Sequence, residues 1–270
     1  MKELQIKISC IIPTCNRGEL LWQAIRSVLT QTKEPAEILV VNNGLEPVNL
    51  PPELAQHVAV YEIVRFAGAA QARNFGASLA RGDYLAFLDD DDLWEASYLA
   101  KVEQAIYSGA KCTVARLDKL EGGNVQPFKN AHGKLSLNNL LVYNPGITGS
   151  NLAVAKEVFL KIGGFDPKLP PSEDKGLLVE FLKAGIAITA LPEAQAIVRV
   201  HGGIRLSDAK RLAEGAFEFT RKYQSLMSWK QYLMNWLKIY RSRYDAGQAL
   251  AFFPFVFLYV LFRILRLWQR

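Results

Sequence analysis

The feature that most constrains this fold is an apolar segment that ends in four aspartates, residues 82–92 (GDYLAFLDDDD). Residues 84–88 have the continuous apolar character of a strand buried in a parallel sheet, so the carboxylates are expected where that strand stops. Four adjacent negative charges repel one another and favour a bound cation. Mg²⁺ and Mn²⁺ take one or two carboxylates and complete their shell with water and phosphates. The segment therefore predicts a divalent metal bound together with a nucleotide diphosphate.

The first 44 residues have the pattern of a β-α-β unit. Residues 6–13 (IKISCIIP) and 38–41 are predicted strands, and residues 19–31 carry apolar side chains at helical spacing. Because strands joined through a helix run parallel, their carboxyl ends meet at one edge of the sheet, where ligands bind in such folds. The residues predicted at that edge are Pro13, Thr14, Asn16, Asn42 and Asn43.

The rest of the first 200 residues continues to alternate between strand and helix patterns. Strands are expected at residues 58–64, 84–88, 110–117, 147–154, 186–191 and 194–200. Helices are expected at residues 69–80, 93–108, 156–162 and 173–184, the last with Ser172 as its N-cap. Residues 121–133 are polar and rich in Gly and Asn, and they are expected to form a mobile loop. The alternation predicts an α/β fold with a mostly parallel central sheet flanked by helices.

The charge of the chain is distributed unevenly. Residues 1–198 hold 19 Lys and Arg against 22 Asp and Glu, whereas residues 199–270 hold 13 against 4. A basic segment of this kind favours a nucleic acid or an anionic membrane surface. Its apolar content favours the membrane, because an unbroken apolar run has no role on a polyanion. No nucleic-acid partner is therefore expected.

The last 63 residues are predicted to be a helical, membrane-associating extension. Helices are expected at residues 209–226 and 229–244, followed by 14 uncharged residues, 249–262 (ALAFFPFVFLYVLF). This run is shorter than the ~20 apolar residues of a spanning helix, and Pro254 is expected to interrupt it. Aromatic residues among many cations are typical of a helix lying in the membrane interface. Packing on the core or in a homodimer, or a re-entrant hairpin at Pro254, are the alternatives. We therefore divide the chain into residues 1–207 and 208–270.

The compartment is predicted from the cysteines and the N-terminus. Cys10, Cys15 and Cys112 form an odd, sparse set without metal-ligand spacing, which fits a reducing compartment. Residues 1–7 resemble neither a signal peptide nor a transit peptide. Together with the basic extension, this predicts a peripheral or monotopic location on the cytoplasmic face of the inner or plasma membrane.

Each candidate site residue also has a purely structural explanation. A single aspartate of residues 89–92 could cap a helix, and Glu173 and Asp174 would stabilise the first turn of theirs. Arg73 could be a solvated helix residue instead of pairing with phosphate or with the acidic cluster. His201, which follows a strand, could be structural and not a metal or phosphate ligand.

The ordered series of motifs raises the functional explanation above the structural one. IIPTCNR, ILVVNNG, QARNFGASLARGDYLAFLDDDD, GSN, GGFD and SED follow one another across residues 6–205. This order resembles family 2 of the inverting glycosyltransferases, which have the GT-A fold. The extension lies outside the shared pattern.

The resemblance implies a role for each motif. In this family the acidic motif contacts the donor ribose and holds Mn²⁺ or Mg²⁺ on the diphosphate, roles that would fall to Asp89, Asp90 and Asp91. The general base matches Asp174, and residues near Arg199 and His201 approach the diphosphate, His201 as a second metal ligand. The other donor-binding positions would be Pro13, Thr14, Asn16, Asn43 and Arg73, and the acceptor side would include Glu173 and Asn151.

The chain departs from the family pattern at the base-binding position. The family usually places Asp where this chain has Asn42 and Asn43. An amide offers both a donor and an acceptor to a base edge, so a UDP-sugar stays the expected donor while the base identity stays open.

The expected function is therefore transfer of a sugar, with inversion and metal assistance, to a hydroxyl of a membrane-linked glycan or lipid. One alternative is a non-catalytic membrane-bound module of the same fold that binds sugar or nucleotide. The other is a sugar nucleotidyltransferase, which would open with a Gly-rich, basic phosphate loop where residues 13–17 (PTCNR) stand.

Overall fold

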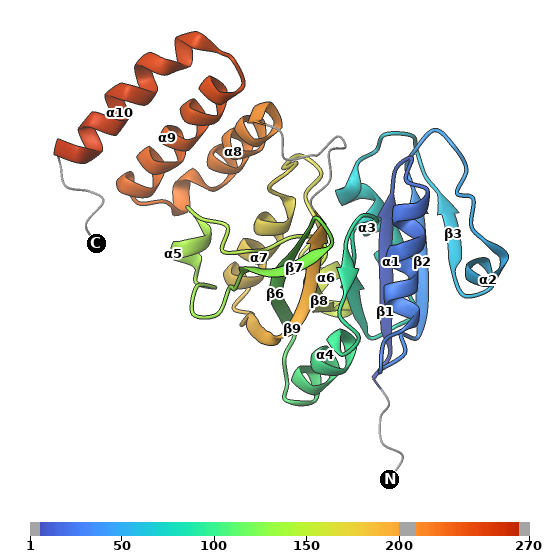
Figure 1. Cartoon of the computed structure of the whole chain (residues 1–270). Coiled ribbons are helices and arrows are strands. Elements are labelled where there is room, and N and C mark those ends of the chain that lie inside the picture. Colours follow the sequence, from blue (N-terminus) through green and yellow to red (C-terminus); the bar gives the residue numbers. More distant parts are fainter. Residues whose placement is uncertain (1–5, 200–208, 265–270) are drawn as a thin grey trace.

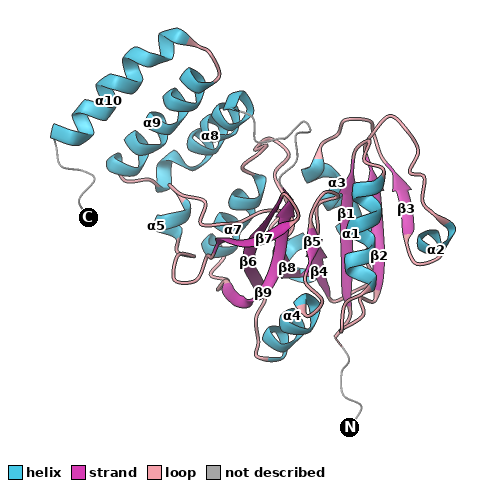
Figure 2. Cartoon of the chain, viewed as in Figure 1, coloured by secondary structure: helices cyan, strands magenta, loops and turns pink. Residues whose placement is uncertain are grey.

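The computed structural model describes residues 6–199 and 209–264. They include one nine-stranded sheet of order β3-β2-β1-β4-β8-β6-β9-β5, with β7 paired to β6 (Figure 2). The first half is parallel throughout: β1 (Ile8–Thr14) lies between β2 (Glu37–Asn42) and β4 (Tyr84–Phe87), and β3 (Ala59–Glu62) flanks β2. The helices between these strands are α1 (Glu19–Leu29), α2 (Pro52–Ala55) and α3 (Ala69–Leu79). The predicted β-α-β unit is present, and its strand ends share one edge.

The second half of the sheet is mixed. Its strands are β5 (Leu93–Trp94), β6 (Cys112–Glu121), β7 (Asn124–Lys129), β8 (Leu152–Ala155) and β9 (Thr189–Arg199). Its helices are α4 (Tyr98–Tyr107), α5 (Leu137–Leu140), α6 (Lys156–Lys161) and α7 (Glu173–Lys183). Because β8 runs antiparallel to both neighbours, and β5 and β7 are also antiparallel to theirs, half of the eight strand pairings are antiparallel. The expectation of a mostly parallel sheet is wrong for this half.

Several predicted boundaries also need correction. Residues 121–133 are not a loop throughout, because β7 forms a hairpin with β6 around Gly122 and Gly123, both at positive φ. The helix expected from residue 93 begins at Tyr98, after β5. The two closing strands are one strand, β9, whose register against β6 shifts near Pro192. Only Leu152–Ala155 of the strand expected at 147–154 is extended, and the residues before it form a turn at the acidic edge.

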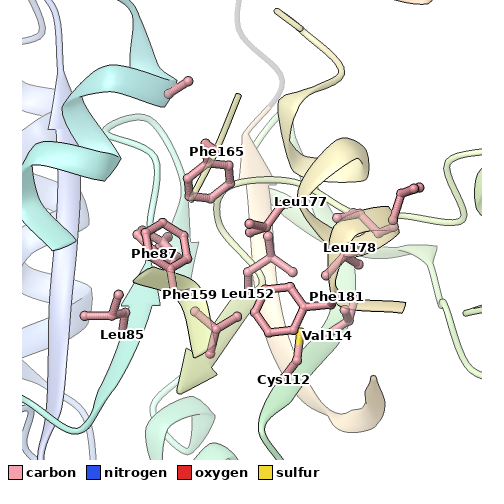
Figure 3. Packing of buried hydrophobic residues seen from close by; sticks show 14 of the residues in the cluster. Leu85, Phe87, Cys112, Val114, Leu152, Phe159, Phe165, Leu177, Leu178 and Phe181 are labelled. Atoms are coloured by element: carbon pink, nitrogen blue, oxygen red, sulfur yellow. The ribbon is translucent and has the colours of Figure 1, made fainter. Parts of the chain in front are cut away.

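The sheet separates two hydrophobic clusters, as alternating side chains of a strand require. On one face, Cys10 and Ile12 pack with α1 and α4. On the other face, Phe87 and Leu152 pack with α6 and α7, and Phe159, Phe165 and Phe181 fill that layer (Figure 3). The rigid three-layer core therefore fixes the sheet edge at which the candidate site lies.

The C-terminal helices stack in order at one end of the molecule, away from the N-terminal strands (Figure 1). They are α8 (Ala209–Tyr223), α9 (Trp229–Asp245) and α10 (Phe252–Ile264). Helix α8 places Phe219 and Tyr223 in the same core cluster as Phe87, and α10 packs on α9 through Leu258 and Leu237. The division at residue 208 stays a prediction.

Pro254 does not interrupt the apolar run. It stands in the first turn of α10, where a backbone N–H has no helical partner and proline is tolerated. Among the described residues, no helix combines the length and the apolar character needed to cross a membrane.

Candidate active site

The four aspartates after β4 lie at the carboxyl edge of the parallel strands, and each has a different environment. Asp90 is 9% exposed and accepts hydrogen bonds from Thr14 Oγ1 at 2.7 Å and from the Cys15 backbone N–H at 3.2 Å. Burial raises the pKa of Asp90 to about 7, against the lowering effect of the Thr14 hydroxyl. Asp90 therefore joins the end of β1 to the end of β4.

Asp92 binds two later segments of the chain at this edge, the turn before β8 and the end of β9. Its carboxylate accepts from Ser150 Oγ at 2.5 Å and from the Arg199 backbone N–H at 3.0 Å. Burial raises the pKa of Asp92 well above its ordinary value, and the neighbouring aspartates add to the rise. The Asp89 backbone N–H donates to the same Ser150 hydroxyl at 3.2 Å. The turn before β8 and the end of β9 are thus fixed against the acidic cluster.

Arg73 of α3 is the centre of the buried electrostatics. Its side chain is 3% exposed, with Nη2 2.5 Å from Asp89 Oδ1. Its Nη1 lies 3.5 Å from Glu173 Oε1 and 3.6 Å from Asp174 Oδ1. The structure therefore places Arg73 against the acidic groups, which is one of the two roles expected for it. Gly149 makes this possible, because a Cβ there would meet the Arg73 guanidinium and Asp89.

Glu173 and Asp174 form the first turn of α7, as expected, and both face Arg73. Burial raises the pKa of Asp174 to about 8; Arg73 opposes the rise, and Glu173 and Asp89 add to it. Burial likewise raises the pKa of Glu173. Glu173 Oε2 and Asp174 Oδ1 are buried without a hydrogen-bond partner in the described part of the chain. Glu173 Oε2 thus suits a hydroxyl of a ligand, whereas Asp174 Oδ1 faces Arg73 Nη1 at 3.6 Å.

The residues expected at the base-binding position lie together at the ends of β1 and β2. Asn43 Nδ2 donates to the Thr14 carbonyl at 2.9 Å, and Pro13 is buried in β1 beside Val41. Asn42 is occupied within the chain: its Nδ2 donates to Glu62 and to the Glu46 carbonyl, and its Oδ1 accepts from Gly44. Asn42 is the strand partner of Thr14, but Asn43 is the residue of the pair whose side chain bonds to Thr14.

The remaining candidates are more dispersed. Asn16 has a left-handed backbone (φ 55°), and its Oδ1 accepts from the Leu45 backbone N–H, so it joins two loops of this edge. Asn151 is fully buried, and its Nδ2 donates to the Ala115 and Gly146 carbonyls. It orders the turn before β8, and its predicted contact with an acceptor stays a prediction. His201 lies outside the described residues.

Three contributors to this edge were not predicted from the sequence: Arg17, Ser150 and Gly149. Arg17 lies 3.4 Å from Asp91 and 3.8 Å from Asp90, measured from Nη2 and Nε to the nearest carboxylate oxygens. Its position in the IIPTCNR motif, after a strand that ends at this edge, is a signal that could have identified it. Ser150 and Gly149 belong to the GSN motif, but their contacts to residues 58 or more positions away are not visible in the sequence.

The donor atoms at this edge are compatible with a divalent metal. Within residues 6–199 and 209–264 no group of three His, Cys, Asp or Glu side chains could hold a metal ion. Asp89 and Asp91 have side chains that are 28 and 23% exposed; Asp89 lies 2.5 Å from Arg73, whereas Asp91 lies 3.4 Å from Arg17. A Mg²⁺-like ion requires only one or two protein carboxylates when phosphates supply further oxygens. Asp91 fits that requirement.

The comparisons with known proteins agree with the geometry. The family model described as Glycosyl transferase family 2 matches residues 9–163. A glycosyltransferase of Haemophilus influenzae is 31% identical over 188 residues, which cover 65% of this chain and 62% of that protein. YwdF of Bacillus subtilis, another glycosyltransferase, is 36% identical over 105 residues, 37% of this chain and 38% of its own. The chain thus spans about 62% and 38% of the lengths of these relatives.

Solved structures share the fold. GalNAc-T7, crystallised with UDP, GalNAc and Mn²⁺, superposes with a TM-score of 0.68 at 19% identity, covering 91% of this chain and 55% of that one. Residues 1–349 of TarS from S. aureus, in complex with UDP-GlcNAc, give 0.62 at 14% identity, covering 88% and 81%. These likenesses establish a GT-A-like α/β fold.

Proposed function

We propose, because this chain belongs to glycosyl transferase family 2, that it transfers a sugar from a UDP-sugar to an acceptor hydroxyl with inversion at the anomeric carbon. The observation that carries the proposal is the contact of Arg73 with Asp89 on one side and with Glu173 and Asp174 on the other. One buried cation thus adjoins the predicted donor contact and the predicted general base. A module that only binds a nucleotide would not require Glu173 and Asp174 beside the donor site.

The base-binding position supports a uracil nucleotide. Because Asn43 Nδ2 donates to the Thr14 carbonyl, the orientation of the amide is fixed and its Oδ1 is left to accept. Uracil presents an N3–H donor, whereas the N3 of cytosine is an acceptor and would be repelled. The solved relatives that carry UDP or UDP-GlcNAc support the same choice.

Metal assistance would involve Asp91, with His201 as the second predicted ligand. A bound Mn²⁺ or Mg²⁺ neutralises the diphosphate and stabilises the leaving group as a Lewis acid. The Mn²⁺ of GalNAc-T7 supports the use of a divalent ion, either of these two. Asp89 and Asp90 are proposed to hold the ribose end of the donor.

Asp174 is proposed as the general base. Inversion by direct displacement requires a carboxylate that takes the proton of the acceptor hydroxyl as its oxygen attacks the anomeric carbon. Asp174 Oδ1 is buried without a hydrogen-bond partner among the described residues, and its raised pKa increases its proton affinity. Glu173, whose Oε2 is also unsatisfied, would orient the acceptor.

The C-terminal helices support an acceptor that lies at an anionic membrane, on the cytoplasmic face. Leu250, Phe253, Phe257 and Val260, which we call the apolar stripe, are exposed by 83, 71, 67 and 45%. The last three recur at helical spacing on one side of α10, and Leu258, on another side, packs on α9. Helices α8 and α9 carry several Lys and Arg residues, and interfacial helices combine such cations with an apolar stripe. A glycan or lipid linked to that membrane is the proposed acceptor, and pairing of two copies through the stripe is the alternative.

Calorimetric titration with UDP, GDP and CMP, each with and without Mn²⁺, tests the donor assignment. We expect binding of UDP with Mn²⁺, and a rise in unfolding free energy of about 2.7 kcal/mol at a hundredfold excess over Kd. Asp91→Asn should remove the effect of Mn²⁺ while leaving the fold intact. The proposal would be contradicted if none of the nucleotides binds, or if UDP binds with the same affinity with and without Mn²⁺. Either result would favour the non-catalytic module.

A further inference from the structure

The loop between β1 and α1 holds Arg17 in a fixed place at the acidic edge. Asn16, the residue before it, adopts a left-handed backbone with φ 55°, and its Oδ1 accepts from the Leu45 and Glu46 backbone N–H groups. Gly44 leaves room for this contact, because a Cβ there would lie 2.5 Å from Asn16 Oδ1. The loop after β1 and the loop after β2 therefore position Arg17 together.

The guanidinium of Arg17 lies between two of the aspartates. Its Nη2 is 3.4 Å from Asp91 Oδ2, and its Nε is 3.8 Å from Asp90 Oδ1. Its side chain is 24% exposed, whereas that of Arg73 is 3% exposed and enclosed by carboxylates. Arg17 is therefore a cation of this edge that a ligand in solution can reach.

We propose that Arg17 competes with the divalent cation for Asp91 and, once the cation is bound, contacts the donor diphosphate with the same guanidinium. The inference rests on the proposed function and deepens it by naming a diphosphate-binding residue that the motif analysis did not select. Arginine suits both partners, because its planar fork matches carboxylate and phosphate oxygens equally well.

This arrangement makes metal and nucleotide binding cooperative. A divalent cation alone has to displace a positive charge from Asp91, which weakens its binding. The nucleotide supplies phosphate oxygens that receive the displaced guanidinium, so each ligand strengthens the binding of the other. Cooperativity between the two ligands should therefore depend on the charge at position 17.

The test compares the wild-type protein with Arg17→Gln and Arg17→Lys. Binding of Mn²⁺ alone is measured from the electron paramagnetic resonance signal of the free ion, and binding of UDP by calorimetry without and with Mn²⁺. In Arg17→Gln we expect Mn²⁺ alone to bind about fivefold more tightly and UDP alone about fivefold more weakly. Arg17→Lys keeps the charge but not the planar fork, so its affinities should lie between those of the wild type and Arg17→Gln. Arg26→Gln is the matched control, since Arg26 pairs with Glu53 on the exposed side of the next helix.

Two results overturn the inference, and they are distinguishable. If the wild type binds UDP with Mn²⁺, and Arg17→Gln binds UDP alone more weakly but Mn²⁺ alone no more tightly, Arg17 does not compete with the metal. If Arg17→Gln binds both ligands like the wild type, Arg17 contacts neither. Failure of the wild type to bind any nucleotide would instead reject the proposed function, and the inference with it.

Discussion

The acidic edge of the sheet and the C-terminal helices depart from the usual distribution of side chains in opposite directions. At the acidic edge, charged groups are buried: Arg73 and Glu173 are 2 and 3% exposed. In the C-terminal helices, apolar groups are exposed, and Phe253 and Phe257 present two thirds or more of their surface. Most charged residues are solvated and most large contiguous apolar surfaces are covered in soluble proteins.

The difference between the two regions concerns what each requires from outside the chain. Buried charges are costly to desolvate, and ion pairing recovers only part of that cost, so the edge is stable only while its pairs remain complete. The exposed apolar stripe does not destabilise the fold of the isolated chain, but covering it with another apolar surface is favourable. The first region thus suits a polar ligand and the second an apolar surface, in line with the two roles proposed above.

The largest effect on stability is expected from removing the shared cation. Arg73→Met leaves Glu173 and Asp174 buried without a positive partner, which should lower the unfolding free energy by about 3–5 kcal/mol in urea titrations at pH 9. Arg26→Met, which breaks an exposed pair with Glu53, should change it by less than about 1 kcal/mol. If the two variants lose equal amounts, the charges at the edge are solvated and not buried.

Turnover should depend on pH through Asp174. The pKa of this carboxyl is raised to about 8, and a general base has to be ionised, so turnover should rise about tenfold per unit below pH 8 and level off above it. Glu173→Gln removes a negative charge that raises this pKa, so the rise should move to lower pH. The rate of UDP release from a UDP-sugar between pH 5.5 and 9.5 measures both. A flat profile across that range would remove Asp174 from the chemistry.

Charging the apolar stripe should weaken membrane binding without changing nucleotide binding. The double variant Phe253→Asp and Phe257→Asp should bind vesicles of phosphatidylglycerol and phosphatidylcholine at least about tenfold more weakly in flotation assays. Val125→Asp and Leu160→Asp, at apolar positions of β7 and α6 that are 49% exposed, form the control. Point substitutions are preferable to deletion from residue 208, because Phe219 and Tyr223 belong to the main core. Unchanged flotation with loss of a dimer in sedimentation would assign the stripe to self-association.

The smallest effect is expected where α7, from the acidic edge, packs on α8, the first of the C-terminal helices; we call this contact the seam. Lys175 of α7 is 8% exposed, with Nζ 3.4 Å from the Phe219 ring centroid on α8, and burial lowers its pKa to about 7. The native state therefore binds fewer protons than the unfolded state between about pH 7 and 10.4, so the Lys175 contribution to stability rises with pH across that window.

Lys175→Met removes this buried charge and should stabilise the protein by about 1 kcal/mol at pH 6 while flattening the pH dependence. Urea titrations at pH 6 and pH 9 measure the difference, and Lys183→Met, at an exposed position on the same helix, is the control. Equal destabilisation at both pH values would mean that the amine itself is needed at the seam.

Much of the fold could be predicted because its elements carry strong local signals. The strands β1, β2 and β4 are continuous apolar runs, and α1 has apolar side chains at regular helical spacing. The sequence therefore predicts each of them to within a few residues. Strand β7 carries no such signal, because every residue in it is exposed. The direction of β8 was also not predictable, since it follows from the path of residues 130–151 and not from a local pattern.

The candidate site shows the same division between local and distant information. The acidic motif and the first turn of α7 could be recognised as polar residues at the ends of apolar elements. That Arg73 would contact both Asp89 and Asp174, 101 residues beyond it, follows only from the fold, which brings the first turn of α7 to the Arg73 side chain at the sheet edge. The partners of Asp92 and the position of Arg17 are likewise set by tertiary contacts.

The central claim is that one edge of the sheet binds the donor and carries the base. It is tested most directly by Asp174→Asn, with UDP binding in the presence of Mn²⁺ and UDP release from UDP-sugars measured on the same preparation. We expect binding within about twofold of the wild type and a loss of release of about 10²–10⁴-fold. Release at the wild-type rate would contradict the assignment of the base. Loss of UDP binding in this variant would contradict the separation of donor and base roles.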